Sequence, residues 1–110
     1  MRNAGFGLAF GLVALAGVAA TAWPAAAADA AHGKTLVERN CSACHAIDLT
    51  GDSPLPIAPR FRELAHRYPI EALAEPLAEG IITGHDGMPE FEATPEQIDD
   101  IIAYLASIQR

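Results

Sequence analysis

The sequence predicts a small all-α domain in residues 29–110, preceded by an export signal in residues 1–28. Three observations support this prediction. No alternating apolar and polar run long enough for a sheet follows Ala28. A capped amphipathic pattern ends the chain, and two long stretches rich in glycine or proline separate the shorter helical segments. A chain of this length therefore has room for one domain of three to five short helices and two long loops.

The first 28 residues have the composition of a secretory signal peptide. Arg2 precedes an apolar stretch over residues 6–22, and small residues follow at the A-x-A positions Ala26 and Ala28. The stretch is rich in glycine and alanine and reaches only the lower end of a transmembrane span, so an uncleaved membrane anchor is the weaker interpretation. We expect cleavage after Ala28, no membrane span in the processed chain, and a periplasmic location.

Charge and cysteine content exclude several classes of protein. The chain carries a net charge of −7, and loss of Arg2 with the signal leaves −8. Such an acidic surface repels nucleic acid and anionic membranes. Two cysteines are too few for a disulfide-rich scaffold or a four-cysteine zinc site. Because so short a domain buries a thin core, we expect a disulfide, a metal or a prosthetic group to stabilise it.

The first helical segments are short. Ala31–Cys44 is expected to be a helix, and residues 60–68 are expected to form about two turns that end before Pro69. Glu71–Ile82 is a further helical stretch, within which Pro76 predicts a kink or a new helix start.

The final helix has the clearest pattern. Thr94 is predicted as its N-cap, Pro95 fits the first helical position, and Gln97 completes a capping box. One apolar face then runs toward the C-terminus, formed by Ile98, Ile101, Ile102, Leu105 and Ile108. Loops are expected over residues 50–59 and 83–91.

Residues 41–45 read Cys-Ser-Ala-Cys-His, which is the C-x-x-C-H signature of c-type haem attachment. Cys41 and Cys44 point the same way from one turn, so both sulfurs can form thioethers with haem vinyl groups while His45 turns toward the iron. A structural disulfide would leave His45 without a role, and a thioredoxin-like redox pair needs a βαβ setting. Zinc would lack a fourth local ligand. The motif therefore predicts one covalently bound haem c.

The residue on the other face of the iron decides the chemistry. Met88 lies in a loop with glycine and proline rather than on a periodic apolar face, and a thioether ligand suits low-spin haem iron. Three histidines are the other candidates: His85 in the same loop, His66 on a solvated helical face, and His32 at the start of the first helix. Met88 is the favoured axial ligand opposite His45.

With this motif, this methionine and this order of elements, the chain resembles the small monohaem class I cytochromes c of the proteobacterial periplasm. The resemblance covers residues 29–110 and implies the class I fold, with short helices wrapped around one covalent haem. It also implies one-electron transfer rather than enzymatic catalysis. Cytochromes c′ place the motif near the C-terminus of a bundle of longer helices, so they fit less well.

Several further positions match the family. Gly33 and Leu36 resemble the first-helix residues that cross the last helix, although many relatives have an aromatic residue in place of Leu36. Ile101 and Tyr104 resemble their packing partners in the last helix. Pro59 resembles the loop proline whose carbonyl accepts a hydrogen bond from the proximal histidine, and this contact fixes the imidazole ring.

These features predict a soluble periplasmic electron carrier whose donor and acceptor are redox proteins. Lys34 is the single lysine of the sequence, so a lysine-ringed docking face is not expected, and the acidic balance favours a partner with a basic face. The exposed haem edge is expected near Ser42, Ala43 and Ala46. Two alternatives remain open: a cytochrome subunit of a periplasmic oxidoreductase, such as a sulfite or alcohol dehydrogenase, and a haem-based gas sensor with a labile methionine.

Overall fold

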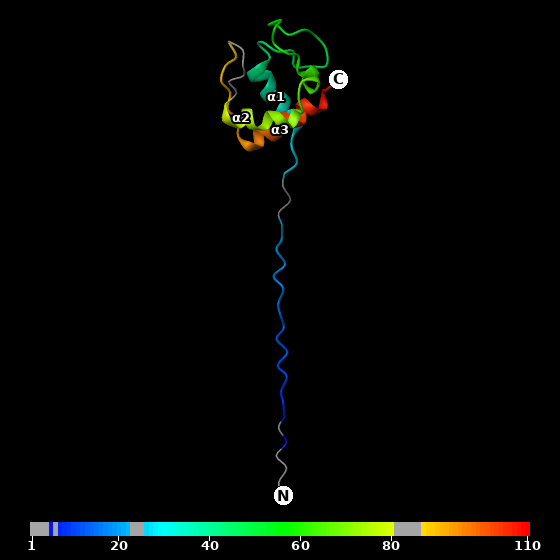
Figure 1. Cartoon of the computed structure of the whole chain (residues 1–110), viewed down its shortest axis with the longest axis vertical. Helices are drawn as coiled ribbons and strands as arrows, with labels where there is room; N and C mark the ends of the chain where they lie inside the picture. The colour runs from blue at the N-terminus through cyan, green and yellow to red at the C-terminus, as the bar shows by residue number, and fades with distance from the viewer. Residues whose placement is uncertain (1–4, 6, 23–25, 81–86) are drawn as a thin grey trace.

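The computed structural model describes residues 5, 7–22, 26–80 and 87–110. The described residues contain no strand and form three α-helices and two 3-10 helices: α1 (Ala30–Cys41), η1 (Phe61–His66), η2 (Ile70–Leu73), α2 (Ala74–Glu79) and α3 (Pro95–Ser107). The described part of residues 5–28 is extended and exposed, and it runs away from the helical body (Figure 1). No helix in the described ranges is long and apolar enough to cross a membrane. The helical class of the domain is confirmed.

Helices α1 and α3, the first and last elements of the body, lie against each other (Figure 1). A Cβ atom at Gly33 of α1 would overlap the carbonyl of Asp100 on α3, so the backbones approach closely only because the side chain is missing. Leu36 of α1 and the α3 residues Ile101 and Tyr104 are buried in the same apolar cluster. This is the crossing that the family resemblance implied.

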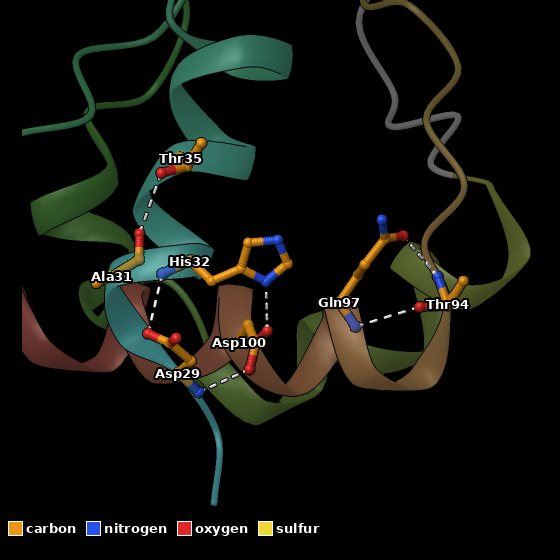
Figure 2. Close-up of polar contacts among 7 residues, drawn as sticks. All are labelled: Asp29, Ala31, His32, Thr35, Thr94, Gln97 and Asp100. Atoms are coloured by element: carbon orange, nitrogen blue, oxygen red, sulfur yellow. Dashed lines mark hydrogen bonds and ion pairs between the residues drawn. The ribbon is translucent and has the colours of Figure 1, made fainter.

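The N-terminus of α3 carries the predicted capping box (Figure 2). The backbone N–H of Gln97 donates to Thr94 Oγ1 at 3.3 Å, and the N–H of Thr94 donates to Gln97 Oε1 at 3.0 Å. Pro95 takes the first helical position, where no intrahelical hydrogen bond is lost. The helix ends at Ser107, with Ile108 as its C-cap, and so stops short of the C-terminus.

The middle of the chain differs from the prediction in detail. Residues 60–68 form a 3-10 helix over Phe61–His66, and the expected helix over Glu71–Ile82 is divided into η2 and α2. Pro76 lies in the first turn of α2, where the missing N–H has no intrahelical partner to lose, so a new helix start is confirmed rather than a kink. Gly80, with φ of 82°, ends α2, and residues 81 and 82 lie outside the described part.

The last two residues fold back onto η1. The N–H of Arg110 donates to the carbonyl of Arg62 at 2.8 Å, and the side-chain amide of Gln109 donates to the carbonyl of Phe61 at 2.8 Å. His66 Nε2 donates to the carbonyl of Arg110 at 2.6 Å. These contacts close the helical body at its C-terminal end.

Candidate functional site

The Cys-x-x-Cys-His segment forms a turn directly after α1. The prediction of a helix through Cys44 is wrong at this end, because α1 ends at Cys41. The carbonyl of Cys41 accepts hydrogen bonds from the N–H groups of both Cys44, at 3.2 Å, and His45, at 3.0 Å. The turn thus continues the helix by one tightened cycle. It keeps the two cysteines a single turn apart, which is the spacing that two thioethers to one porphyrin require.

The thiol chemistry of the pair argues against a redox dithiol. Neither Cys41 nor Cys44 is in a disulfide. Burial raises the pKa of the Cys41 thiol to about 11. Reactive redox cysteines need a thiolate at neutral pH, which a lowered pKa provides. Cys41 has the opposite character, as expected for a sulfur buried at the wall of an apolar site.

His45 is buried, with 8% of its surface exposed, and it is held by the loop that follows it. Its Nδ1–H donates to the carbonyl of Pro59 at 2.7 Å. Since a carbonyl only accepts, the proton lies on Nδ1, and the lone pair of the neutral ring is on Nε2, the nitrogen suited to an iron. The ring of Phe61 packs against the imidazole with a centroid distance of 4.6 Å. Pro59 thus lies where the resemblance placed it.

Three hydrogen bonds fasten the proline-rich loop to the motif. Ser53 Oγ accepts from the N–H of Ala46 at 2.9 Å, the N–H of Leu55 donates to the carbonyl of Cys44 at 3.1 Å, and the N–H of Phe61 donates to the carbonyl of Ala46 at 2.9 Å. Ala46 is therefore buried, with 7% exposure, so the expectation that it belongs to an exposed contact patch is wrong.

An apolar cavity of about 280 Å³ lies beside His45. Met88 also lines it, from the segment that precedes α3. The remaining walls come mainly from η1, η2, α2 and α3, through Phe61, Leu64, Leu73, Leu77, Ile101 and Leu105. A second cavity of about 70 Å³ is lined by Cys41, Cys44, His45 and Met88 together with other residues. His45 and Met88 therefore border both hollows.

These residues fit a haem. The cysteine sulfurs and the imidazole come from one turn, Met88 borders the same space, and the walls are apolar enough to enclose a porphyrin. Arg67 and Tyr68 line the larger cavity from exposed positions, where a guanidinium and a phenol suit the haem carboxylates. Haem c therefore matches both the shape and the chemistry of the site.

The comparisons with known proteins agree with this site. The cytochrome c family model matches residues 30–109, which span the whole helical body. The chain belongs to the cytochrome c family. A curated relative, cytochrome c-552 of Bradyrhizobium diazoefficiens, is 31% identical over 99 residues, which cover 90% of this chain and 93% of the relative. As a cytochrome c, the protein is a haem c electron carrier and not an enzyme, and Cys41 and Cys44 fit the attachment motif.

Met88 enters this cytochrome c site from a sharp turn. Gly87 has φ of 88°, a left-handed conformation that favours glycine. Met88 follows it, is half-buried, and packs against the apolar core cluster. The unusual backbone at Gly87 thus directs the chain so that a loop methionine reaches the cavity wall.

The histidines weighed against Met88 are placed elsewhere. His32 pairs with Asp100 at the α1–α3 crossing, and its Nδ1 lies 2.6 Å from Asp100 Oδ2 (Figure 2). His66 donates to the C-terminal carbonyl of Arg110. His85 lies outside the described residues. Two of the three alternative ligands therefore have partners away from the cytochrome c cavity.

Two features of this cytochrome escaped the sequence analysis. Tyr104 Oη donates to the carbonyl of Ile47 at 2.5 Å, which connects α3 to the segment after the haem motif. Burial, and then the negative charge of Asp48, raise the pKa of Tyr104 above its usual value of 10.0. The second feature is the His32–Asp100 contact. Both join residues far apart in the chain, so no local pattern points to them.

Proposed function

We propose that this cytochrome c is a periplasmic one-electron carrier in which His45 and Met88 bind the haem iron from opposite faces. One observation carries the proposal: a single apolar cavity is lined by both residues, and the attachment cysteines line the adjoining hollow. Haem c supplies an iron that alternates between the ferrous and ferric states.

The protein residues tune and insulate this centre. The Pro59 carbonyl fixes the His45 ring and increases its basicity. The soft thioether of Met88 favours ferrous iron and raises the reduction potential. Leu64, Leu77 and the other apolar walls exclude water. Since neither ligand changes between the two iron states, little reorganisation opposes electron transfer.

Electrons are proposed to enter and leave beside the thioethers. Ser42 and Ala43 are exposed there, on the turn between the two cysteines. Leu55 donates its N–H to Cys44, and its side chain is 36% exposed, while nearby Ile57 is 73% exposed. These apolar and small residues form a surface on which a redox partner can approach the porphyrin edge closely.

The test of ligation is Met88→Ala. The haem should remain attached, because the thioethers at Cys41 and Cys44 do not depend on the axial methionine. The ferric protein should lose the weak long-wavelength absorption band typical of iron–methionine bonding, and the ferrous protein should gain carbon monoxide binding. His66→Ala is the matched control and should change neither property, since His66 contacts Arg110.

The same experiment separates the carrier from a gas sensor. A carrier with Met88 on the iron should not bind carbon monoxide at ambient pressure, whereas a sensor with a labile methionine should. Persistence of the long-wavelength band in Met88→Ala, or its absence from the unaltered protein at neutral pH, contradicts the proposed ligation.

A permanent place in an oxidoreductase complex is the second candidate function. The exposed Leu55 and Ile57 beside Cys44 favour it, because lasting interfaces are apolar. Purification from native membranes and periplasm at moderate salt distinguishes the two. A free carrier should elute as a protein of its own mass, and a subunit should elute with its catalytic partner.

A further inference from the structure

The N-terminal end of α1 is fastened to α3 through one carboxylate, Asp100 (Figure 2). The backbone N–H of Asp29 donates to Asp100 Oδ1 at 2.6 Å, and His32 Nδ1 lies 2.6 Å from Asp100 Oδ2. The N–H of His32 in turn donates to Asp29 Oδ1 at 3.0 Å, which caps the helix. Both oxygens of Asp100 are therefore engaged by the residues that begin the domain.

Asp100 is an anion at neutral pH. The hydrogen bond from His32, and next the one from the Asp29 N–H, lower its pKa below the usual value of 3.8. Its side chain is 15% exposed, whereas that of His32 is 50% exposed. The titratable groups in these contacts are His32 and the Asp29 carboxylate from the α1 side and Asp100 from α3.

The position of the Asp29 nitrogen gives this contact a second meaning, which rests on the export and processing proposed above. Hydrolysis of the Ala28–Asp29 peptide bond consumes one water and leaves a carboxylate on Ala28 and a protonated amine on Asp29. We propose that this new ammonium group stays at the position of the Asp29 N–H and forms an ion pair with Asp100. Removal of residues 1–28 thereby strengthens the link between α1 and α3.

Two observations support this arrangement. Residues 26–29 are exposed and lie outside any helix, so the bond before Asp29 is open to a peptidase. An ammonium group at a helix N-terminus is repelled by the helix dipole. The carboxylate of Asp100, already at hydrogen-bond distance from the same nitrogen, offsets that repulsion.

The direct test measures the pKa of the Asp29 α-amino group by NMR titration of the exported, haem-loaded protein, after its N-terminus has been verified by mass. We expect a value above the ordinary range of about 7.7 to 8.0, because a nearby anion favours the charged amine. In Asp100→Asn the value should fall to that range or below. Asp99→Asn, a neighbouring exposed position on α3, is the matched control and should leave it raised.

A stability cycle gives an independent readout. Insertion of Gly-Ser-Gly-Ser between Ala28 and Asp29 makes processing leave a short extension, which moves the ammonium group away from Asp100. The melting temperature should drop by about 2 to 5 °C in low salt, and less in high salt. In the Asp100→Asn background the same insertion should have no effect, because the ion pair is already absent.

Each outcome decides the matter. An α-amino pKa that is the same in the unaltered protein and in Asp100→Asn overturns the ion pair. So does a melting temperature that the insertion lowers equally in both backgrounds. A secreted chain that keeps residues 1–28 overturns the proposal at the processing step. The haem spectrum of Met88→Ala reports on the electron-carrier function separately, so the two failures are distinguishable.

Discussion

One hydrogen bond determines how His45 presents itself to a metal. The Pro59 carbonyl holds the proton on Nδ1 and fixes the ring, while Phe61 packs against its face. This geometry needs a loop that returns to the motif 14 residues later, and Ser53 and Leu55 fasten that loop. A histidine in a C-x-x-C-H motif thus becomes a well-oriented ligand only through residues outside the motif.

Tyr104 makes an equally specific contact. Tyr104→Phe should destabilise the protein by about 1 to 3 kcal/mol, because the buried Ile47 carbonyl loses its donor. The raised pKa of Tyr104 means that its stabilising contribution is fully present below pH 10 and is lost as the pH rises through the folded-state value. Chemical denaturation from pH 7 to pH 11 measures both effects.

Tyr104→Phe should therefore remove part of the alkaline loss of stability as well as lowering stability at neutral pH. An alkaline profile that is unchanged in Tyr104→Phe would show that another group dominates above pH 10. The variant leaves the haem ligands intact, so the absorption spectrum confirms that the site is still assembled.

At the scale of elements, the α1–α3 crossing organises the domain. Gly33 touches the backbone of α3 at Asp100 and Ile101, and Leu36 and Tyr104 are buried in the shared core. Helix propensity alone predicts that Gly33→Ala stabilises α1 by about 1 kcal/mol. The overlap with the Asp100 carbonyl predicts the opposite sign, and we expect a net loss of about 1 to 3 kcal/mol.

Thermal and denaturant unfolding of the haem-loaded protein measure the sign of this change. Ala31→Gly, at an exposed position in the first turn of the same helix, is the control for propensity without overlap. A Gly33→Ala protein more stable than the unaltered one would contradict the close crossing.

The elements also show what a sequence can and cannot predict. The capping box of α3 and the restart at Pro76 were predictable, because each depends on residues within one turn. The end of α1 was placed too late, at Cys44, because the turn after Cys41 retains helix-like hydrogen bonds. The 3-10 form of Phe61–His66 has no distinctive local pattern. The contacts of His32 and His66 depend on partners more than 40 residues away.

The whole molecule has a thin core. Val37 is the one large side chain among the described residues with less than 2% exposure, and a cavity of about 280 Å³ lies among the core residues. A domain built around such a hollow depends on what fills it. Most of the site could be predicted from sequence because the attachment motif is local, whereas the cavity walls required the tertiary structure.

Haem attachment is accordingly expected to be necessary for folding. The double variant Cys41→Ala plus Cys44→Ala should yield a largely unfolded or rapidly degraded chain. Circular dichroism during heating measures this directly. A cooperative transition near the melting temperature of the unaltered protein would contradict it. Met88→Ala, which keeps both thioethers, is the control and should still unfold cooperatively.

The acidic surface should steer association with redox partners. Exposed carboxylates dominate the surface, and Asp48 and Asp52 are the members partly neutralised by Lys34 and Arg60. Stopped-flow electron transfer with a small basic redox protein should slow as salt rises, since screening acts over about 8 to 10 Å at moderate ionic strength. An acidic redox protein of similar potential is the control and should react faster as salt rises. Rates with the basic protein that are flat or rise with salt would contradict steering.

The contact between Asp29 and Asp100 joins residues 71 positions apart, at the two ends of the domain. A chain that emerges from a ribosome or a translocon with its N-terminus first cannot complete the α1–α3 pairing until residues 95–107 are also free. Folding of such a topology is slow to begin, because a long loop must close before its strongest contact forms. Until then Cys41 and Cys44 stay unburied, which provides a kinetic window for haem to be attached.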